Sequence, residues 1–253
     1  MRRLLRVLLL LVAFAGICLA GGAFAVYQWA LADLPDLAVL ESYHPSLEDV
    51  PKTLDSLIYF PIGREDMTPA LRLAFLAAED PTFYDRPQGF IRKLWDATLP
   101  LRHSGMMADR HPGTSPITQQ VIRRLRSFDE SPPRNRMIRQ ILLAAHMEAT
   151  LSRDTILWVY LNKVYLGNYT YGVEAAARAC FGRHASELSI AQCAVLAALP
   201  KAPTEYNPYK NPEGNRNRQL WILGQMLEKD FITQAEYDEA KDAPIGLLPK
   251  PPM

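Results

Sequence analysis

Cysteine is scarce in this chain, which has three among its 253 residues: Cys18, Cys180 and Cys193. No Cys-x-x-Cys spacing occurs, and this argues against a zinc site built from cysteines. Cys18 lies in an apolar leader, so the body of the chain contains only Cys180 and Cys193. In an oxidising compartment these could form a disulfide, but free cysteine is among the most buried residue types. We therefore expect two buried thiols on helices.

The chain also lacks a strong net charge. Its 28 Lys and Arg residues offset 27 Asp and Glu residues, which leaves a formal net charge of +1. Without a general basic field, the composition gives no case for nucleic-acid binding. Positive charge is concentrated locally in residues 113–139, where an anionic ligand would meet it. The length and the 49% hydrophobic content suit one packed domain plus an appendage.

The N-terminal segment combines positive charge with a long apolar run. Arginines in residues 1–6 precede about 26 uncharged residues, 7–32, whereas about 20 are enough to cross a bilayer core. Because arginines stay on the cytoplasmic side, the body would be exported. A cleaved signal peptide is the alternative, since residues 23–25 (Ala-Phe-Ala) offer a small-x-small cleavage site. The apolar run continues past that site, so we expect an uncleaved anchor.

The body shows helical periodicity and no internal repeat. Four prolines in residues 33–63 forbid a continuous helix there, which indicates a connector with one candidate short strand at residues 57–60. Apolar spacing predicts helices at residues 70–80, 134–151, 156–165, 173–180, 189–199, 215–228 and 233–241. Pro81 is expected to end the first of them, Ser152 to cap the third, and Thr233 with Glu236 to form a capping box at the start of the last. Residues 167–172 are expected to form a loop, and the proline-rich residues 244–253 a loose tail. The expected fold is therefore mainly α, with little or no sheet.

The first helix of the body is expected to end at two carboxylates. Thr68 and Pro69 are a typical N-cap and first helical residue. Glu79 and Asp80 then lie at the C-terminal end, where the helix dipole disfavours negative charge. A carboxylate in that position is a candidate general base with a raised pKa. The alternative is a pair of solvated acids.

A candidate phosphate site follows at residues 113–120, with the sequence Gly-Thr-Ser-Pro-Ile-Thr-Gln-Gln. Gly113 permits close approach of the backbone, and Ser115 and Thr118 could cap a helix whose first N–H groups favour an anion. Three arginines in residues 121–126 add positive charge. An ordinary capped amphipathic helix is the alternative.

Taken together, these residues resemble the glycosyltransferase family 51 domain of peptidoglycan glycosyltransferases. That domain occurs in monofunctional transglycosylases and in the N-terminal half of class A penicillin-binding proteins. Residues 78–83 (Ala-Glu-Asp-Pro-Thr-Phe) are similar to its first motif, and residues 113–120 to its second. The third and later motifs resemble residues 136–148, 152–157, 160–162, 172–177, 181–182 and 194–200. The resemblance covers residues 68–240.

The resemblance implies a lysozyme-like helical domain with a small membrane-proximal jaw, preceded by one N-terminal transmembrane helix. The implied reaction polymerises lipid II into glycan strands, with inversion and release of undecaprenyl diphosphate. The implied partners are lipid II, the nascent glycan strand, the membrane and other cell-wall synthesis proteins. The catalytic domain would lie on the outer, periplasmic face of the cytoplasmic (inner) membrane. The expected division is 1–32 cytoplasmic N-terminus and anchor, 33–67 connector, 68–243 glycosyltransferase domain and 244–253 tail.

The resemblance also assigns roles to residues. Glu79 matches the family's general base, which takes the proton from the acceptor 4-hydroxyl. Arg123 and Arg136 would neutralise the leaving diphosphate. The full substrate-binding set is Asp80, Phe83, Ser115, Thr118, Gln119, Gln120, Arg123, Arg124 and Arg136. No cofactor is required by the resemblance, and a divalent cation (Mg²⁺ or Mn²⁺) assists some members; no residue is assigned to a metal.

This sequence departs from the family pattern at several positions. The second essential glutamate is Gln140 here, and glutamine keeps the size and one acceptor but loses the charge. Glu148 is expected on the same helix but about 12 Å further along, too distant to replace it. The remaining departures are Arg86 for a histidine, Gln88 for a glycine, Pro116 for a threonine, and Arg123-Arg124 for Lys-Asn.

Two hypotheses follow. The first is an active, divergent lipid II polymerase, in which added arginine charge offsets the missing glutamate at Gln140. The second is a membrane-tethered pseudoenzyme that binds lipid II or glycan, or docks a partner, without turnover. We favour the first because Glu79, Asp80 and the Ser/Thr/Gln/Gln core are retained. Glycan cleavage would need an acid catalyst and has no support beyond fold analogy.

Overall fold

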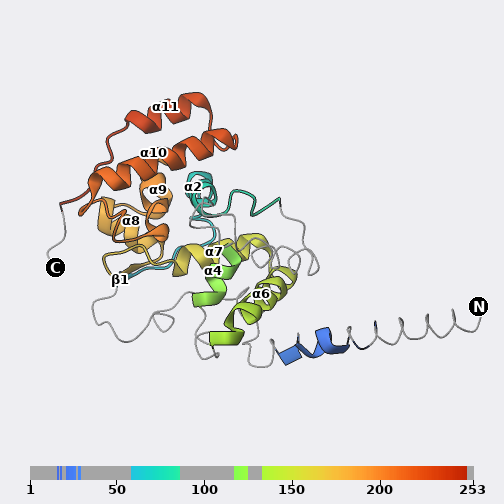
Figure 1. Cartoon of the computed structure of the whole chain (residues 1–253). Helices are drawn as coiled ribbons and strands as arrows, with labels where there is room; N and C mark the ends of the chain where they lie inside the picture. Colours follow the sequence, from blue (N-terminus) through green and yellow to red (C-terminus); the bar gives the residue numbers. More distant parts are fainter. Residues whose placement is uncertain are drawn as a thin grey trace, which may run out of the picture.

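The computed structural model describes residues 16, 18, 21–26, 28–29, 58–85, 117–124 and 133–249. The elements of the body are β1 (Ile58–Tyr59), α2 (Pro69–Glu79), α4 (Ile117–Arg124), α6 (Pro133–Thr150), α7 (Arg153–Lys163), β2 (Thr170–Tyr171), α8 (Val173–Phe181), η3 (Ala185–Glu187), α9 (Ile190–Ala197), η4 (Leu199–Lys201), α10 (Pro212–Glu228) and α11 (Gln234–Asp242). The prediction of a mainly α body is confirmed (Figure 1).

Two groups of helices build the body. α2, α9, α10 and α11 pack on one another in one group, and α4 packs on α6 and α7 in the other. Figure 1 shows the first group above the second, with α8 beside α9. α8 contacts both α7 and α9, so it links the two groups.

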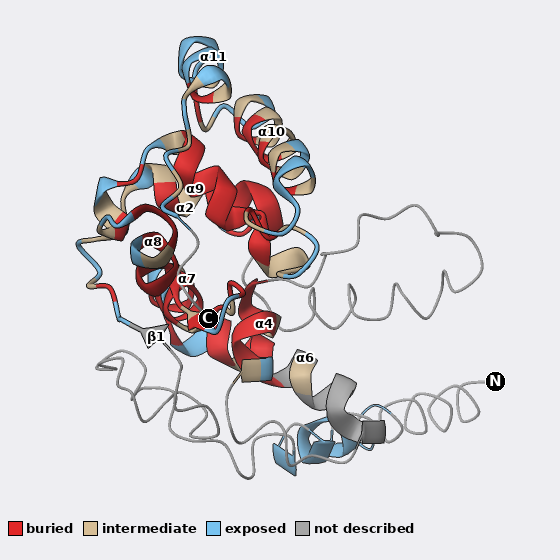
Figure 2. Cartoon of the chain, turned by 90° about the vertical axis from the view of Figure 1, so that its left-hand side faces the viewer, coloured by how far each residue is buried: buried red, intermediate tan, exposed pale blue. Residues whose placement is uncertain are grey.

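The core is centred on α2, α7 and α9, which Figure 2 draws largely as buried. Residues 191–197 of α9 are all buried, and a helix that is buried on every side needs neighbours all round. α2 and α10 supply two of them, because both pack directly on α9. This packing fixes the C-terminal end of α2, where the candidate base lies.

Local capping sets several helix starts as predicted. The side chain of Thr68 accepts a hydrogen bond of 3.3 Å from the backbone N–H of Leu71, the third residue of α2. Ser152 caps α7 in the same way. Thr233 and Glu236 form the expected capping box at the start of α11.

A short parallel pairing of β1 with β2 joins the connector to the body. The candidate strand at residues 57–60 is confirmed, whereas the expected loop at 167–172 contains β2. A strand of two residues is too short to show an alternating pattern in the sequence. Gly172 follows β2 with φ +82°, and a Cβ there would lie 2.8 Å from the carbonyl oxygen of Asn162, so only glycine fits this turn.

The expectation of a loose tail is wrong for its described residues, 244–249. The amide of Leu248 donates to the carbonyl of Cys180 at 2.8 Å. The side chain of Gln192 donates to the carbonyl of Ile245 at 3.0 Å. Apolar side chains among the prolines, Ile245 and Leu247, pack against the core, and this anchors the segment.

The two cysteines of the body are buried free thiols, as expected. Burial raises the pKa of Cys180 to about 11 and that of Cys193 to about 12. Neither thiol is therefore ionised near neutral pH.

The expected membrane anchor falls largely outside the described residues. Those that are described, 16, 18, 21–26 and 28–29, are helical and exposed. Within the described part of the chain, no helix combines the length and the apolar character needed to cross a membrane.

Candidate active site

Glu79 is the last residue of α2 and is buried, with 8% of its surface exposed. Its Oε2 accepts a hydrogen bond of 2.7 Å from the side-chain amide of Gln120 on α4. Its Oε1 is also buried, and it has no hydrogen-bond partner among the described residues. The carboxylate is thus oriented at one oxygen, and the acceptor capacity of the other is unsatisfied.

The predicted rise in the pKa of Glu79 is confirmed, but its main cause is different. Burial raises the pKa most, whereas the prediction was based on the helix dipole. The Gln120 hydrogen bond, Arg218 and Arg124 lower it, in that order, and Asp80 raises it. A buried carboxylate beside two cations can ionise, and once ionised it is a stronger base than a solvated one.

Asp80 is the C-cap residue of α2, and its side chain also contacts the start of α4. It is 1% exposed, and its Oδ2 accepts the backbone N–H of Ile117, the first residue of α4, at 3.3 Å. The predicted phosphate site at this helix start therefore already faces an internal carboxylate. Gly113 and Ser115, the other parts of that prediction, lie outside the described residues.

Thr118 is not the cap of α4, as the sequence suggested, but its second residue. It is fully buried, and its hydroxyl donates to Oε1 of Glu148 on α6 at 2.7 Å. Glu148, which sequence reasoning set aside as too far from Gln140, instead holds α4 against α6. The hydroxyl of Thr118 therefore forms a hydrogen bond between α4 and α6.

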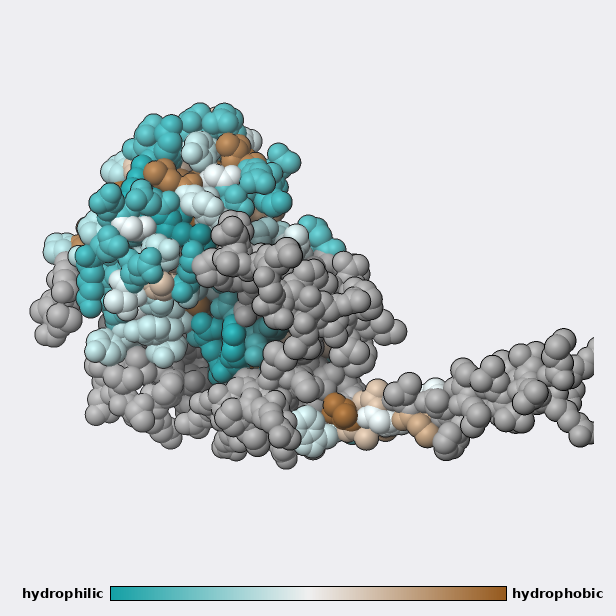
Figure 3. Space-filling model, in the orientation of Figure 1, coloured by the Kyte–Doolittle hydropathy of each residue, from teal (hydrophilic) through white to brown (hydrophobic). Residues whose placement is uncertain are grey.

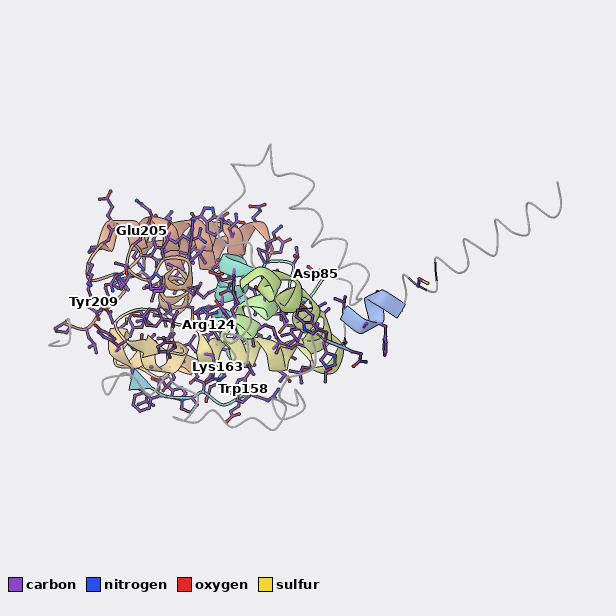
Figure 4. The ribbon with its side chains drawn as sticks, turned by 60° about the horizontal axis from the view of Figure 1, so that its bottom comes forward. Asp85, Arg124, Trp158, Lys163, Glu205 and Tyr209 are labelled. Carbon is purple, nitrogen blue, oxygen red and sulfur yellow. The ribbon has the colours of Figure 1, made fainter. Side chains whose placement is uncertain are left out.

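The exposed side of α4 presents the basic residues. Nη1 of Arg124 lies 3.1 Å from the carbonyl oxygen of Gln120 and 3.4 Å from its side-chain oxygen. Arg123 is exposed next to it. Figure 3 shows a hydrophilic surface near the middle of this face, where Figure 1 draws α4. Figure 4 shows Arg124 near the middle of the domain, with Lys163 and Trp158 of α7 beneath it.

Gln140 on α6 meets Gln119 on α4. Its side-chain amide donates at 3.4 Å to both the backbone carbonyl and the side-chain oxygen of Gln119. A glutamate at this position could not donate when ionised, so the contact depends on the amide. Arg136 lies one turn earlier in α6, but its side chain is outside the described residues.

Phe83 belongs to the core and not to the surface of the site. It is 2% exposed, in the turn after α2, and its amide donates to the carbonyl of Asp80 at 3.0 Å. The guanidinium of Arg153 lies 5.5 Å from its ring centroid. Phe83 therefore supports the turn that carries Asp80.

Comparison with known proteins identifies the family. A family model described as "Transglycosylase" matches residues 56–227. The chain belongs to the transglycosylase family. The predicted resemblance is confirmed at this level, with a transglycosylase domain of the class A penicillin-binding-protein type.

Relatives of this transglycosylase chain are named penicillin-binding protein 1A. The protein from Vibrio cholerae serotype O1 is 35% identical over 95% of this chain and 30% of its own length. That from Pseudomonas aeruginosa is 40% identical over 74% of this chain and 22% of its own length. That from Escherichia coli K12 is 33% identical, with 90% and 27% covered. The chain thus spans less than a third of the length of these relatives.

A crystal structure of penicillin-binding protein 1A from Haemophilus influenzae is also similar to this transglycosylase. The similarity has a TM-score of 0.45 at 24% sequence identity, and it covers 77% of this chain and 19% of that one.

Two residues near Glu79 of the transglycosylase were not selected from the sequence. Tyr160 on α7 is completely buried, with its ring edge-on to Phe75 at 6.2 Å, and its hydroxyl has no partner among the described residues. Burial raises the pKa of Tyr160 far above its ordinary value. Arg218 on α10 donates from Nη2 to the carbonyl of Ala78 at 3.4 Å. Tyr160 lies inside a stretch that resembles a family motif, but no local signal in the sequence marks Arg218.

A resident metal ion does not fit the described part of the site. No group of three or more His, Cys, Asp or Glu side chains that could hold one occurs among the described residues. The acids nearest the site, Glu79, Asp80 and Glu148, each bind a different donor of α4. Each of these three carboxylates is thus already hydrogen-bonded within the protein.

Proposed function

We propose that this chain is a peptidoglycan glycosyltransferase that polymerises lipid II into glycan strands and releases undecaprenyl diphosphate. The observation that carries the proposal is the state of Glu79 in a chain of the transglycosylase family. It is a buried carboxylate with one oxygen held by Gln120 and the other without a partner among the described residues. Arg124 and Arg218 lie close enough to lower its pKa.

In the proposed reaction Glu79 accepts a proton at Oε1 from the 4-hydroxyl of the acceptor sugar. The acceptor oxygen attacks C1 of the donor sugar from the face opposite the diphosphate. The new C1–O bond forms as the bond from C1 to the diphosphate oxygen breaks, so the configuration inverts. Glu79 ends the step protonated, and the lipid diphosphate leaves with the bonding electrons.

The departing diphosphate gains charge, and preorganised cations would stabilise it. Arg123 and Arg124 on the exposed side of α4 are the candidates, with Arg136 on α6 as a third. Because Asp80 already faces the first amide of α4, we assign this role to the arginine side chains and not to the helix N-terminus. Gln119 and Gln140, which contact each other, would border the same surface.

Because the proposed substrate is linked to a lipid, the proposed function also implies a location at the membrane. We propose a single-pass protein of the cytoplasmic membrane, anchored by residues 7–32, with the lysozyme-like domain and its jaw on the outer face. Its partners would be lipid II, the growing glycan strand and other cell-wall synthesis proteins. A divalent cation is not assigned to any step.

One observation favours a second candidate, a pseudoenzyme that binds lipid II or glycan without turnover. Gln140 stands where the family pattern has an essential glutamate, and its amide is occupied in donating to Gln119. If that glutamate is indispensable for positioning the diphosphate, binding would persist and transfer would not.

Polymerisation of labelled lipid II by the purified full-length chain separates the two. The polymerase hypothesis expects glycan product from the wild type and its loss in Glu79→Gln. Product in the wild type that disappears in Glu79→Gln rules out the pseudoenzyme. No product from the wild type, with product from Gln140→Glu, rules out the polymerase as the native function.

A further inference from the structure

Arg218 belongs to α10 and lies inside the matched family region, but α10 contains none of the motif residues compared above. Its Nη2 nevertheless donates at 3.4 Å to the carbonyl of Ala78, a residue 140 positions earlier in the chain. Ala78 directly precedes Glu79, and α10 packs against α2. The contact therefore ties α10 to the helical turn that carries the proposed base.

The guanidinium of Arg218 is held in a fixed orientation. It stacks on the ring of Trp221, with 3.8 Å between its central carbon and the ring centroid. A planar guanidinium stacked in this way is restricted in rotation. The charge of Arg218 also interacts with Glu79, since each group shifts the pKa of the other toward its charged form.

We propose that Arg218 is a positioning residue for Glu79: it fixes the C-terminal turn of α2 through the Ala78 carbonyl and holds a positive charge beside the carboxylate. A cation is also favourable at the negative end of the α2 dipole. This inference rests on the proposed function in one respect: the position of Glu79 matters for polymerisation only if Glu79 is the base.

The charged and titratable groups that face Glu79 come from α2, α4, α7 and α10; they are Asp80, Arg123, Arg124, Tyr160 and Arg218. α9 also packs on α2, and its sequence contains no charged residue. Of the two cations that lower the pKa of Glu79, Arg218 has the larger effect. Its removal is therefore expected to raise that pKa and to favour the protonated carboxyl, which cannot accept a proton.

The test follows the carboxyl carbon of Glu79 directly. The full-length chain, labelled with ¹³C at the glutamate carboxyls and held in detergent, is titrated by NMR, and the signal missing in Glu79→Gln assigns Glu79. Arg218→Gln is compared with the wild type and with Arg216→Gln. Arg216 is a matched control, because it is also partly buried on α10 but bonds to Gln219 and to the carbonyl of Lys241.

We expect Arg218→Gln to raise the pKa of Glu79, and Arg216→Gln and the charge-preserving Arg218→Lys to leave it near the wild-type value. The acid limb of kcat/KM for lipid II polymerisation should move to higher pH with it, giving about tenfold slower polymerisation on that limb. Arg218→Met, which keeps an apolar stem against Trp221, gives the same comparison if Arg218→Gln folds poorly.

The outcomes separate this inference from the function it rests on. If Glu79 has the same pKa in Arg218→Gln as in Arg216→Gln, the inference is overturned, whether or not the protein polymerises lipid II. A shifted titration together with no polymer from the wild type at any pH supports the link from Arg218 to Glu79 and overturns the polymerase function. A shifted titration and a shifted acid limb support both.

Discussion

The side-chain amide of Gln120 donates to Oε2 of Glu79 at 2.7 Å, joining two residues that are 41 positions apart in the chain. The other end of the same amide is also fixed, because its oxygen lies 3.4 Å from Nη1 of Arg124. A cation on the oxygen side requires the NH₂ group to point the other way, toward the carboxylate. Arg124 thus orients Gln120, and Gln120 orients Glu79.

Replacing Gln120 with methionine should remove this orientation while keeping a side chain of similar length. A hydrogen bond to a charged group contributes about 1.5–3 kcal/mol, so kcat/KM for lipid II polymerisation should fall by about 10- to 100-fold. Because the bond lowers the pKa of Glu79, its loss should also move the acid limb of the pH–rate profile upward. Gln225→Met, at an exposed amide that bonds Glu228 on α10, is the control. An acid limb that stays in place would contradict the role given to Gln120.

Replacing Thr118 with valine should destabilise the contact between α4 and α6. The substitution keeps the shape but removes the 2.7 Å donor to the buried Glu148. The expected loss is about 1–3 kcal/mol of unfolding free energy, measured by denaturant titration. Thr150→Val is the matched control, because Thr150 is exposed and its hydroxyl bonds only within α6, to the carbonyl of His146. Equal losses in the two variants would argue against an interhelical role.

The sequence predicted best the features that depend on nearby residues. The caps at Thr68, Ser152 and Thr233 needed only a side chain and an amide a few positions later. The end of α2 at Glu79 followed from apolar spacing and from the proline after Asp80. These choices are settled within one helical turn, so a single sequence contains the information.

Contacts between distant helices were not predictable in the same way. Asp80 pairs with the first amide of α4, and Thr118 pairs with Glu148, only because α2, α4 and α6 converge. Spacing alone suggested a cap for Thr118 and no partner for Glu148. Arg218 reaches the site from α10, and nothing near it in the sequence distinguishes it from an ordinary arginine of an amphipathic helix.

Replacing Tyr160 with phenylalanine should stabilise the protein. The ring would keep its edge-on contact with Phe75, whereas the lost hydroxyl is fully buried without a partner among the described residues. Removing an unsatisfied buried polar group is worth on the order of 1 kcal/mol, or about 2–4 °C in Tm. Differential scanning calorimetry measures the change. A lower Tm would mean that the hydroxyl has a stabilising partner.

The body thiols should be protected from thiol reagents in the folded protein. With Cys18 replaced by serine, we expect no labelling of Cys180 or Cys193 by a maleimide near neutral pH, and labelling of both after denaturation. Burial blocks access and keeps the thiols protonated, since their pKa values are about 11 and about 12. Mass spectrometry counts the adducts. Labelling of native Cys193 at a rate typical of exposed thiols would contradict its burial.

Replacing Glu79 with glutamine should increase stability at neutral pH, although it should abolish polymerisation. Burial raises the pKa of Glu79 in the folded protein above the ordinary 4.5. Below about pH 4.5 the carboxyl is protonated in both the folded and the unfolded protein, so burying Glu79 does not cost the free energy of burying a charge. As pH rises through the folded pKa the group must ionise while buried, so the folded wild type loses stability relative to the neutral variant. The Tm difference measured across this range should therefore grow with pH.

Glu236 provides a control of opposite sign. Its carboxylate accepts the backbone N–H of Thr233 at 2.7 Å in the capping box of α11, and this bond is the main cause of its lowered pKa. Its stabilising effect is present above the unfolded pKa and is lost as pH falls through the folded value. Glu236→Gln should therefore lower the Tm at neutral pH, with a difference that shrinks in acid. A Glu79→Gln effect with the same sign and slope as Glu236→Gln would show that Glu79 is stabilised, not strained, in its ionised form.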